Sequence, residues 1–508
     1  METLNRKLLP SIHTPGLEIG PQKEYPVKVM QFGEGNFLRA FIDWMIDKSN
    51  EAGKFNGMVQ LVQPLPQGTA DLINAQDGLY TLILRGMENG APAEYKRIIT
   101  CVKGCLKTDS DWEAIVKCAV SPDLQLVFSN TTEAGIEYKP EPYTPGKTQV
   151  TYPAKLTSLL FERFKAGQKG LVLVPCELID KNGSTLRDCI LRYAADWKLG
   201  AGFENYVKEE CAFMNTLVDR IVAGYPRNEA ADWCKKLGYQ DNLIDCGEIF
   251  HLFVIEGDEK YRAVIPFAEA GLHVVWTKNQ TPYRSRKVRF LNGGHTSSVL
   301  AAYQAGFDFV DQMTGDKLFG KYLRTALFEE VFPTVQLPDD EKKAFAESII
   351  ERFLNPFANH QLISISLNSI SKWQVRVLPS LIDYEKINGK LPKVLTFSLA
   401  ALLAFSFAAL LSFYRGTVDA AGNWSGKRAA GAYPIRDDAE KIAFLNAEFD
   451  RLKQSGDYEA FIRTVMARTD FWGMDLNTIP GFTARAAADL RSIDELGITS
   501  AVEKLLEK

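Results

Sequence analysis

The sequence predicts an α/β protein, with an N-terminal Rossmann-type doubly wound sheet followed by a mostly α-helical C-terminal domain. Within residues 27–62 an apolar run, a glycine-rich turn, a helical pattern and a second apolar run follow one another, which is the order of a βαβ unit. Beyond Tyr283 the strand signals fade and long helical patterns dominate. Because 508 residues are too many for one core, we expect two domains, over residues 1–285 and 286–508, the second of them all-helical.

The composition is that of an ordinary globular protein, with 46% apolar and 24% charged residues. A net charge of −4 gives no attraction to nucleic acid or to anionic lipid, so we expect neither as a partner. The eight cysteines form no CxxC pair and the five histidines are widely separated, so we expect no metal site. Residues 1–7 lack the apolar stretch of a signal peptide, and we therefore expect a cytoplasmic protein with reduced cysteines.

The elements of the first domain follow from short apolar runs. Residues 1–26 form an arm with little pattern, and the first strand is expected over residues 27–32. A helix is expected after the glycine-rich turn, since apolar residues recur at helical spacing over residues 37–48. Further strands, buried on both faces as in a parallel sheet, are predicted over residues 58–62, 124–128 and 170–174.

Helical patterns in the second half of the chain cover residues 296–305, 321–332, 339–353, 394–414, 437–454 and 458–468. The run over residues 394–414 carries no charge and is long enough to span a bilayer. Its interior is an eight-residue near-repeat, rich in alanine and containing three serines. That composition suits close packing between helices, so we favour a buried helix over a membrane anchor.

The glycine-rich turn over residues 31–40 has the features of a dinucleotide site. Gly33 and Gly35 allow a tight turn that approaches a pyrophosphate, and the helix that follows offers unpaired N–H groups. The third glycine of the usual GxGxxG pattern is replaced by Leu38. We assign the cofactor contacts to Gln31, Phe32, Gly33, Glu34, Gly35, Asn36, Phe37, Leu38 and Arg39.

The choice between NAD and NADP depends on the end of the second strand. Residues 63–68 contain neither an acid that would accept from a ribose hydroxyl nor an arginine that would bind a 2′-phosphate, and the first acid is Asp71. The missing cation favours NAD. Asn130 and Thr131 follow another buried strand and are assigned to the cofactor as well, although an ordinary capped turn explains them equally well.

Lys287, Asn292 and His295 form the clearest catalytic pattern. On an α-helix the three residues lie within roughly 140° of one another. The two glycines after Asn292 indicate either a helix start capped by that asparagine or a backbone that approaches a ligand closely. A lysine with a depressed pKa can act as general acid and base, Asn292 can bind the substrate oxygen, and His295 can hold a neighbouring hydroxyl. The alternative is a surface lysine on a basic stretch beside a capping asparagine.

Taken together, the motifs resemble the polyol-specific long-chain dehydrogenases, the family of mannitol dehydrogenase, and most closely their tagaturonate reductase (altronate oxidoreductase) branch. The resemblance covers nearly the whole chain. It is carried by residues 31–40, 76–80, 128–136, 175–180, 216–221, 287–295 and 352–357.

This resemblance implies a zinc-independent, NAD-dependent enzyme with Lys287 as acid/base, Asn292 at the oxyanion and His295 at a substrate hydroxyl. It further implies that Asp219, Lys372 and Glu133 contact the substrate or its proton path. Arg376 lies one helical turn after Lys372, and we expect it to grip a substrate carboxylate, although a structural ion pair is an equal alternative.

The chain departs from the mannitol-type pattern at Glu177-Leu178 and at Ser364, which argues for a different sugar end-group, as in a uronate. The expected reaction is the NADH-dependent reduction of tagaturonate to altronate and its reverse, in hexuronate catabolism. The alternatives are a fructuronate reductase or another polyol dehydrogenase, a non-catalytic nucleotide-binding sensor, and a membrane-associated protein anchored by residues 394–414.

Overall fold

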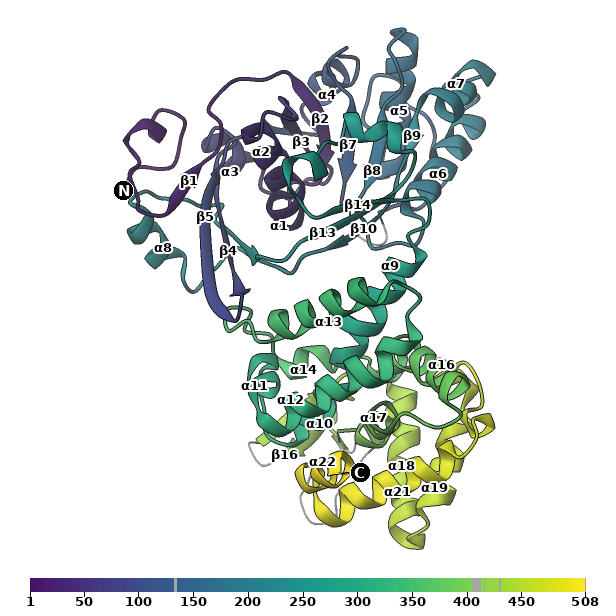
Figure 1. Cartoon of the computed structure of the whole chain (residues 1–508). Helices are drawn as coiled ribbons and strands as arrows, with labels where there is room; N and C mark the ends of the chain where they lie inside the picture. The colour runs from purple at the N-terminus through teal and green to yellow at the C-terminus, as the bar shows by residue number, and fades with distance from the viewer. Residues whose placement is uncertain (132–134, 404–412, 415, 429–430, 508) are drawn as a thin grey trace. The chain divides into compact units, whose positions relative to one another are not determined.

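The structure is a computed structural model that describes residues 1–131, 135–403, 413–414, 416–428 and 431–507. The chain divides into two compact units, Met1–Gln280 and Thr281–Lys508 (Figure 1). The division lies five residues before the boundary expected from the change of sequence texture.

A six-stranded, wholly parallel sheet is the centre of the first unit. Its strand order is β6-β3-β2-β7-β8-β9, which is the 3-2-1-4-5-6 order of doubly wound dinucleotide-binding folds. The bounds are β6 (Val102–Lys107), β3 (Met58–Gln63), β2 (Val27–Phe32), β7 (Leu126–Ser129), β8 (Val172–Pro175) and β9 (Ala212–Phe213). The predicted Rossmann-type sheet is confirmed.

Helices cover both faces of this sheet because its strands are apolar on both sides. Val29 and Leu61 belong to one buried cluster, and Met30 and Val62, their neighbours along the strands, belong to another. The helices of this unit are α1 (Asn36–Leu38), η2 (Arg39–Asp43), α2 (Trp44–Glu51), α3 (Ala70–Ala75), α4 (Trp112–Ala119), α5 (Tyr152–Lys165), α6 (Asn182–Asp196), α7 (Ala201–Asn205), η3 (Tyr206–Glu210) and α8 (Ala230–Leu237).

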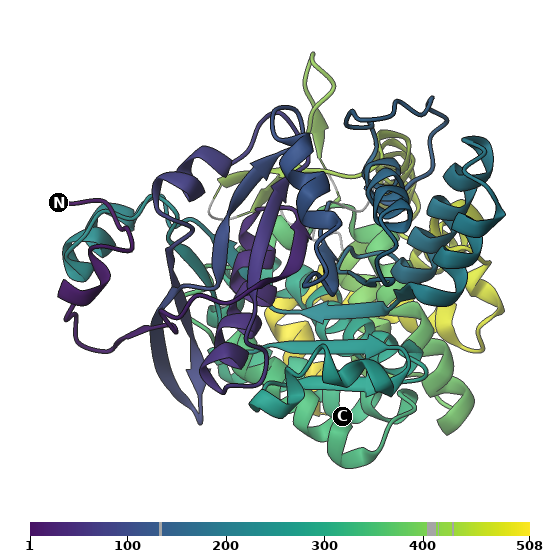
Figure 2. The same cartoon turned by 90° about the horizontal axis from the view of Figure 1, so that it is seen from above.

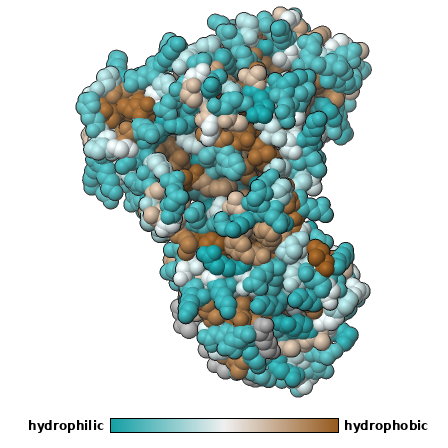
Figure 3. Space-filling model, viewed as in Figure 1, coloured by the Kyte–Doolittle hydropathy of each residue, from teal (hydrophilic) through white to brown (hydrophobic). Residues whose placement is uncertain are grey.

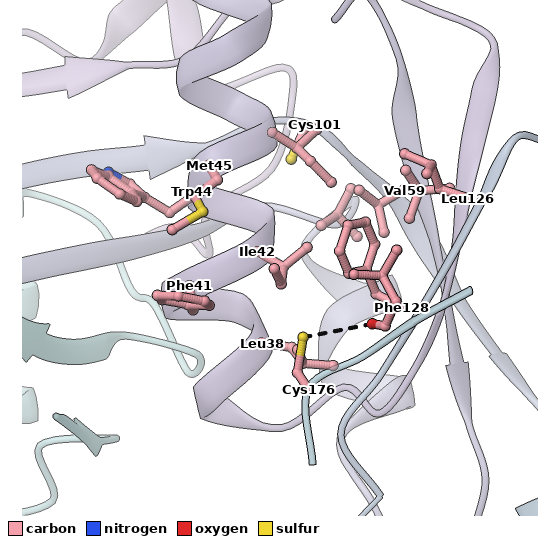
Figure 4. Close-up of a cluster of buried hydrophobic side chains, with 14 of the residues drawn as sticks. Leu38, Phe41, Ile42, Trp44, Met45, Val59, Cys101, Leu126, Phe128 and Cys176 are labelled. Atoms are coloured by element: carbon pink, nitrogen blue, oxygen red, sulfur yellow. Dashed lines mark hydrogen bonds between the residues drawn. The ribbon is translucent and has the colours of Figure 1, made fainter. Parts of the chain in front are cut away.

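The helix that follows the glycine-rich turn is anchored on the sheet by its apolar side chains. Leu38 and Ile42 point toward Val59 and Phe128 of the sheet, while Phe41 lies on the opposite side of the helix (Figure 4). All five side chains are fully buried or nearly so. This packing fixes the start of the helix against the ends of β2 and β7, where a ligand binds in such folds.

Two further sheets in this unit were not predicted. One has the order β1-β5-β4-β12-β11, and the other has the order β10-β13-β14. Their bounds are β1 (Leu17–Ile19), β4 (Tyr80–Glu88), β5 (Ala91–Ile99), β10 (Asn215–Asp219), β11 (Val222–Gly224), β12 (Asp245–Glu248), β13 (Leu252–Glu256) and β14 (Val274–Thr277). The long hairpin of β4 and β5 is drawn in dark blue in Figure 2. The arm over residues 1–26 is therefore partly ordered by pairing, since β1 lies parallel to β5.

The second unit is mainly helical, as predicted. Its helices are α9 (Thr281–Arg286), η6 (Lys287–Asn292), α10 (Gly293–Gln304), α11 (Val310–Gly315), α12 (Lys317–Arg324), η7 (Thr325–Val331), α13 (Asp339–Phe353), α14 (Leu362–Ile365), α15 (Ser369–Arg376), α16 (Leu378–Asn388), α17 (Lys393–Leu403), α18 (Ala439–Ser455), α19 (Tyr458–Met466), α20 (Thr469–Trp472), α21 (Phe482–Leu496) and α22 (Ile498–Glu507). The expectation of an all-helical domain is wrong in one place. An antiparallel sheet joins β15 (Thr417–Val418), β16 (Trp424–Arg428) and β17 (Gly431–Ile435), whose strands are too short to give a clear alternating pattern.

The uncharged run over residues 394–414 begins as α17, which is buried in the second unit. Its N-terminus is capped by the buried carboxylate of Glu330, which accepts from the backbone N–H groups of Val394 (2.8 Å) and Leu395 (2.9 Å). Residues 404–412, and with them most of the near-repeat, lie outside the described residues. Among the helices that the structure describes, none is long and apolar enough to cross a membrane. On the face drawn in Figure 3, hydrophilic side chains predominate and apolar patches are scattered between them.

Candidate active site

The glycine-rich turn has the backbone geometry that a dinucleotide requires. Gly33 has a φ of 111°, and a Cβ atom placed on it would lie 3.1 Å from the carbonyl oxygen of Asn130. Gly35 caps the helix that follows, and nothing lies within 4 Å of the position that its Cβ would take. The turn therefore presents open space in front of a helix N-terminus, and the residues present fit a pyrophosphate.

The helix after the turn runs continuously from Asn36 to Glu51, through α1, η2 and α2. Leu38 stands where a third glycine is usual, and its side chain packs into the core beneath the turn. Arg39 is buried, and its guanidinium group donates to the carbonyl of Leu243 (2.8 Å) and to Oδ1 of Asn36 (2.6 Å). The buried guanidinium group of Arg39 thus holds the start of the helix in place, which its position in the motif did not predict.

The other assigned cofactor residues lie at the same edge of the sheet. Gln31 and Phe32 end β2 and are buried, and Nε2 of Gln31 donates to the carbonyl of Gly33 (3.1 Å). The Oε1 atom of this glutamine is buried without a partner among the described residues. Phe37 is half-buried and stacks on Phe41 at 5.2 Å.

The polar residues after β7 are tied to the end of β8. Thr131 donates to Oε1 of Glu177 from its backbone N–H (2.9 Å) and its hydroxyl (3.0 Å), and Ser129 donates to Oε2 of the same carboxylate (3.1 Å). Asn130 donates to the carbonyl of Cys176 (2.9 Å). Burial raises the pKa of Glu177, and these hydrogen bonds oppose the rise. These hydrogen bonds fix the ends of β7 and β8 beside each other.

Lys287, Asn292 and His295 lie on one continuous helix in the second unit. Residues Lys287–Asn292 form a π-helical turn between α9 and α10. In a π turn the backbone hydrogen bond joins residues i and i+5, which places Lys287 and Asn292 close to the same face. His295 follows Asn292 at i+3 on the α-helix. Of the two alternatives for the glycine pair, a helix start capped by Asn292 is wrong, because the backbone of Asn292 is helical and its side chain makes no capping hydrogen bond.

The glycines after Asn292 have a packing reason. A Cβ atom on Gly293 would lie 2.9 Å from the carbonyl oxygen of Arg376, so the glycine lets α10 and α15 approach closely. This contact brings the end of α15, which carries Lys372 and Arg376, next to the helix that carries the lysine, asparagine and histidine. Two groups of predicted site residues that are far apart in sequence therefore meet.

His295 is buried between two rings. Phe353 stacks on its imidazole with a centroid distance of 3.9 Å and an angle of 18°, and His360 approaches edge-on at 5.0 Å. Burial holds the pKa of His295 well below its usual value, and the positive charges of His360, Arg352, Arg376 and Lys372 lower it further. The imidazole is neutral at pH 7, and its Nδ1 atom has no partner among the described residues.

Two cations on α15 differ in their contacts. Lys372 donates to the carbonyl of Ile365 at 2.8 Å. Arg376 is half-buried and forms no side-chain hydrogen bond or ion pair within the described part of the chain. Burial lowers the pKa of Arg376, which is the expected response of a guanidinium group that lacks an anion. By contrast, Arg289 is paired with Asp383 (2.6 Å) and donates to Thr334.

The structure locates one of the two remaining predicted substrate-side residues. Asp219 is buried at the end of β10 in the first unit. Glu133 lies outside the described residues. The side chains around His295 belong to Arg352, Phe353 and His360, to which the sequence analysis gave no role. The motif over residues 352–357 could have pointed to the first two of them. The described residues contain no group of three or more His, Cys, Asp or Glu side chains arranged to hold a metal ion.

Comparison with known proteins decides the family. Residues 27–265 match the mannitol dehydrogenase Rossmann domain, and residues 279–494 match the mannitol dehydrogenase C-terminal domain. The chain belongs to the mannitol dehydrogenase family. Membership places it among the dehydrogenases that act on CH–OH groups.

Similar proteins include the altronate oxidoreductases of Escherichia coli O6:K15:H31 (40% identical over 513 residues) and of Shigella flexneri (40% over 512 residues). Each alignment covers 99% of this chain and all of the relative. Among solved structures, a substrate-free D-sorbitol dehydrogenase has a TM-score of 0.79 at 20% identity, covering 98% of this chain and all of the other. Pseudomonas fluorescens mannitol 2-dehydrogenase, in a ternary complex with NAD and D-mannitol, has a TM-score of 0.68 at 20% identity and full coverage of both chains. These two structures confirm the fold.

Proposed function

We propose that the protein catalyses the NAD-dependent interconversion of D-tagaturonate and D-altronate. The observation that carries the proposal is the 40% identity to altronate oxidoreductases over the full length of both chains. The unpaired Arg376 beside a buried imidazole supports a substrate that carries a negative charge.

NAD is the cofactor that the first unit fits. The open turn at Gly33 and Gly35, the parallel sheet order and the helix N-terminus form the usual pyrophosphate cradle. The structurally similar mannitol 2-dehydrogenase of Pseudomonas fluorescens holds NAD in its ternary complex. When bound, NADH supplies the hydride, and the residues of the second unit manage the proton.

Lys287 acts as the general acid/base in this proposal. In reduction its ammonium group donates a proton to the oxygen of the substrate carbonyl as negative charge develops there, and in oxidation the neutral amine takes the hydroxyl proton. Asn292, on the same face of the π turn, donates a hydrogen bond to that oxygen. His295 is neutral, so it can donate to or accept from a substrate hydroxyl without adding charge.

Arg376 and Lys372 bind the substrate carboxylate. A guanidinium group can grip a carboxylate with two parallel, charge-assisted hydrogen bonds, and Arg376 has no competing anion in the described structure. Asp219 and Glu133 are further substrate-side residues of the proposal.

We also propose the cytoplasm as the compartment, since all eight cysteines lie in the described part of the chain and none is in a disulfide.

The test is an NADH-oxidation assay with tagaturonate, fructuronate and the neutral ketose fructose. Tagaturonate should be reduced with the highest kcat/KM and give altronate as the product. A preference for fructuronate would move the protein to the fructuronate reductases while leaving the chemistry intact. A preference for fructose would refute the hexuronate assignment, and absence of any turnover would favour a non-catalytic sensor.

A further inference from the structure

Recognition of the adenosine ribose is the part of the nucleotide site that the sequence leaves unassigned. In dinucleotide-binding folds an acid at the end of the second strand accepts a hydrogen bond from the ribose 2′-hydroxyl. Here that strand is β3, and the loop after it, residues 64–69, contains no acid. Asp71, the first acid along the chain, is exposed and pairs with Lys107 at 2.7 Å.

A carboxylate nevertheless reaches this loop from the glycine-rich turn. Glu34 lies between Gly33 and Gly35 at the end of β2, and β2 and β3 are neighbouring parallel strands. Its Oε1 atom accepts from the backbone N–H of Thr69 at 3.4 Å. A Cβ atom on Gly68 would overlap this same oxygen, so the backbone of the loop passes directly over the Glu34 carboxylate.

The loop is held in this position by a second side chain. Gln63 ends β3 and donates from Nε2 to the carbonyl of Leu65 (2.8 Å), and its Oε1 accepts from the N–H of Ala70 (3.0 Å). The hydroxyl of Thr69 is buried and has no partner among the described residues. The loop is thus preorganised around Glu34 and keeps one polar atom unused.

Glu34 is half-buried and forms no ion pair within the described part of the chain. Burial is the main influence on its pKa, which it raises, and the charge of Arg39 acts only as a smaller opposing effect. Arg39 itself donates to Leu243 and Asn36. The carboxylate therefore keeps acceptor capacity and negative charge that no described cation satisfies.

We propose that Glu34 is the residue that selects NADH over NADPH, by accepting hydrogen bonds from the adenosine ribose hydroxyls and repelling a 2′-phosphate. The turn that cradles the pyrophosphate then also supplies the acid that other sequences place after β3. This inference rests on the proposed function, because it requires that the protein bind a nicotinamide dinucleotide. It gives a role in cofactor specificity to the position between the two glycines, which the GxGxxG motif leaves variable.

The test is the ratio of the dissociation constants for NADPH and NADH, measured by fluorescence titration without substrate. Glu34→Gln keeps the size of the side chain but removes the charge and one acceptor oxygen. It should weaken NADH binding by roughly tenfold, the scale of one hydrogen bond to a charged group, and tighten NADPH binding. Asp71→Asn is the matched control, because it removes the nearest acid along the chain after β3.

The inference holds if the ratio falls about tenfold or more in Glu34→Gln and changes by less than about twofold in Asp71→Asn. An unchanged ratio in a Glu34→Gln protein with a wild-type melting temperature overturns it, as does a fall in the Asp71→Asn ratio alone. A wild-type protein that binds neither nucleotide refutes this inference and the proposed function together. If the ratio responds as expected but tagaturonate is not reduced, the assignment of Glu34 stands and only the proposed substrate fails.

Discussion

Replacing Arg376 by alanine removes a cation that the described structure leaves without an anion. A hydrogen bond to a charged group contributes about 1.5–3 kcal/mol, so losing the grip on a carboxylate should cost ~2 kcal/mol of transition-state stabilisation. At 1.36 kcal/mol for each factor of ten, kcat/KM for tagaturonate should fall roughly 30-fold. Because Arg376 has no described partner, the protein should remain as stable as the wild type to within about 0.5 kcal/mol.

The assay compares tagaturonate with fructose, whose corresponding end carries no charge. The loss should be confined to tagaturonate, and the affinity for NADH should stay the same. Arg289→Ala serves as the matched control, since Arg289 lies in the same unit but is paired with Asp383. Arg376→Ala kinetics within about twofold of the wild type on tagaturonate would refute the carboxylate assignment.

Two further predictions concern the scaffold of the second unit. Gly293→Ala should destabilise the protein by ~1–3 kcal/mol in urea unfolding, because the new Cβ would lie 2.9 Å from the carbonyl oxygen of Arg376. Gly315→Ala is the control and should be nearly neutral, because its Cβ would meet only Leu354 at 3.9 Å. Equal effects of the two substitutions would contradict the close approach of α10 and α15. Burial raises the pKa of Glu330 from 4.5 to about 7, so the folded state holds this proton more tightly than the unfolded state. The contribution of protonated Glu330 to the free energy of unfolding is complete below pH 4.5 and is lost as the pH rises to about 7. The loss is on the order of 3 kcal/mol. Glu330→Gln should abolish this part of the pH dependence of the free energy of unfolding.

Local patterns predicted several elements around the candidate nucleotide site. The strand over residues 27–32 matches β2 to the residue, because an apolar run that ends at glycine leaves few alternatives. The helix α13 matches the predicted residues 339–353, since its apolar spacing is uninterrupted. Right-handed crossovers between such strands then restrict the sheet orders that the chain can adopt.

The sheet that contains β4 and β5 was not predicted, although the sequence carries one signal for it. Asn89 and Gly90 both have positive φ (52° and 78°) and join β4 to β5 in a two-residue hairpin turn. An Asn-Gly pair is the strongest short-range hairpin signal. The strand β5 was obscured because it is largely exposed over residues 91–96, so it lacks the apolar run that marked the other strands.

The sequence named candidate site residues but could not give their geometry. An ordinary α-helix places Lys287 and Asn292 at different angles, and only the π turn aligns them. The gathering of Arg352, His360 and Arg376 around His295 depends on packing between helices distant in sequence, which local periodicity does not encode. Nor could the sequence show that Glu34 reaches the loop after β3, since that contact depends on how the loop folds back over the end of β2.

The most direct test of the account is the turnover of Lys287→Ala with tagaturonate and NADH, beside a Lys343→Ala control. Lys343 is exposed on α13 and only loosely paired with Glu347 (3.9 Å). The account predicts that Lys287→Ala lowers kcat by at least ~10²-fold with an unchanged affinity for NADH, while Lys343→Ala behaves like the wild type. Near-normal turnover by a folded Lys287→Ala protein at neutral pH would contradict the lysine mechanism.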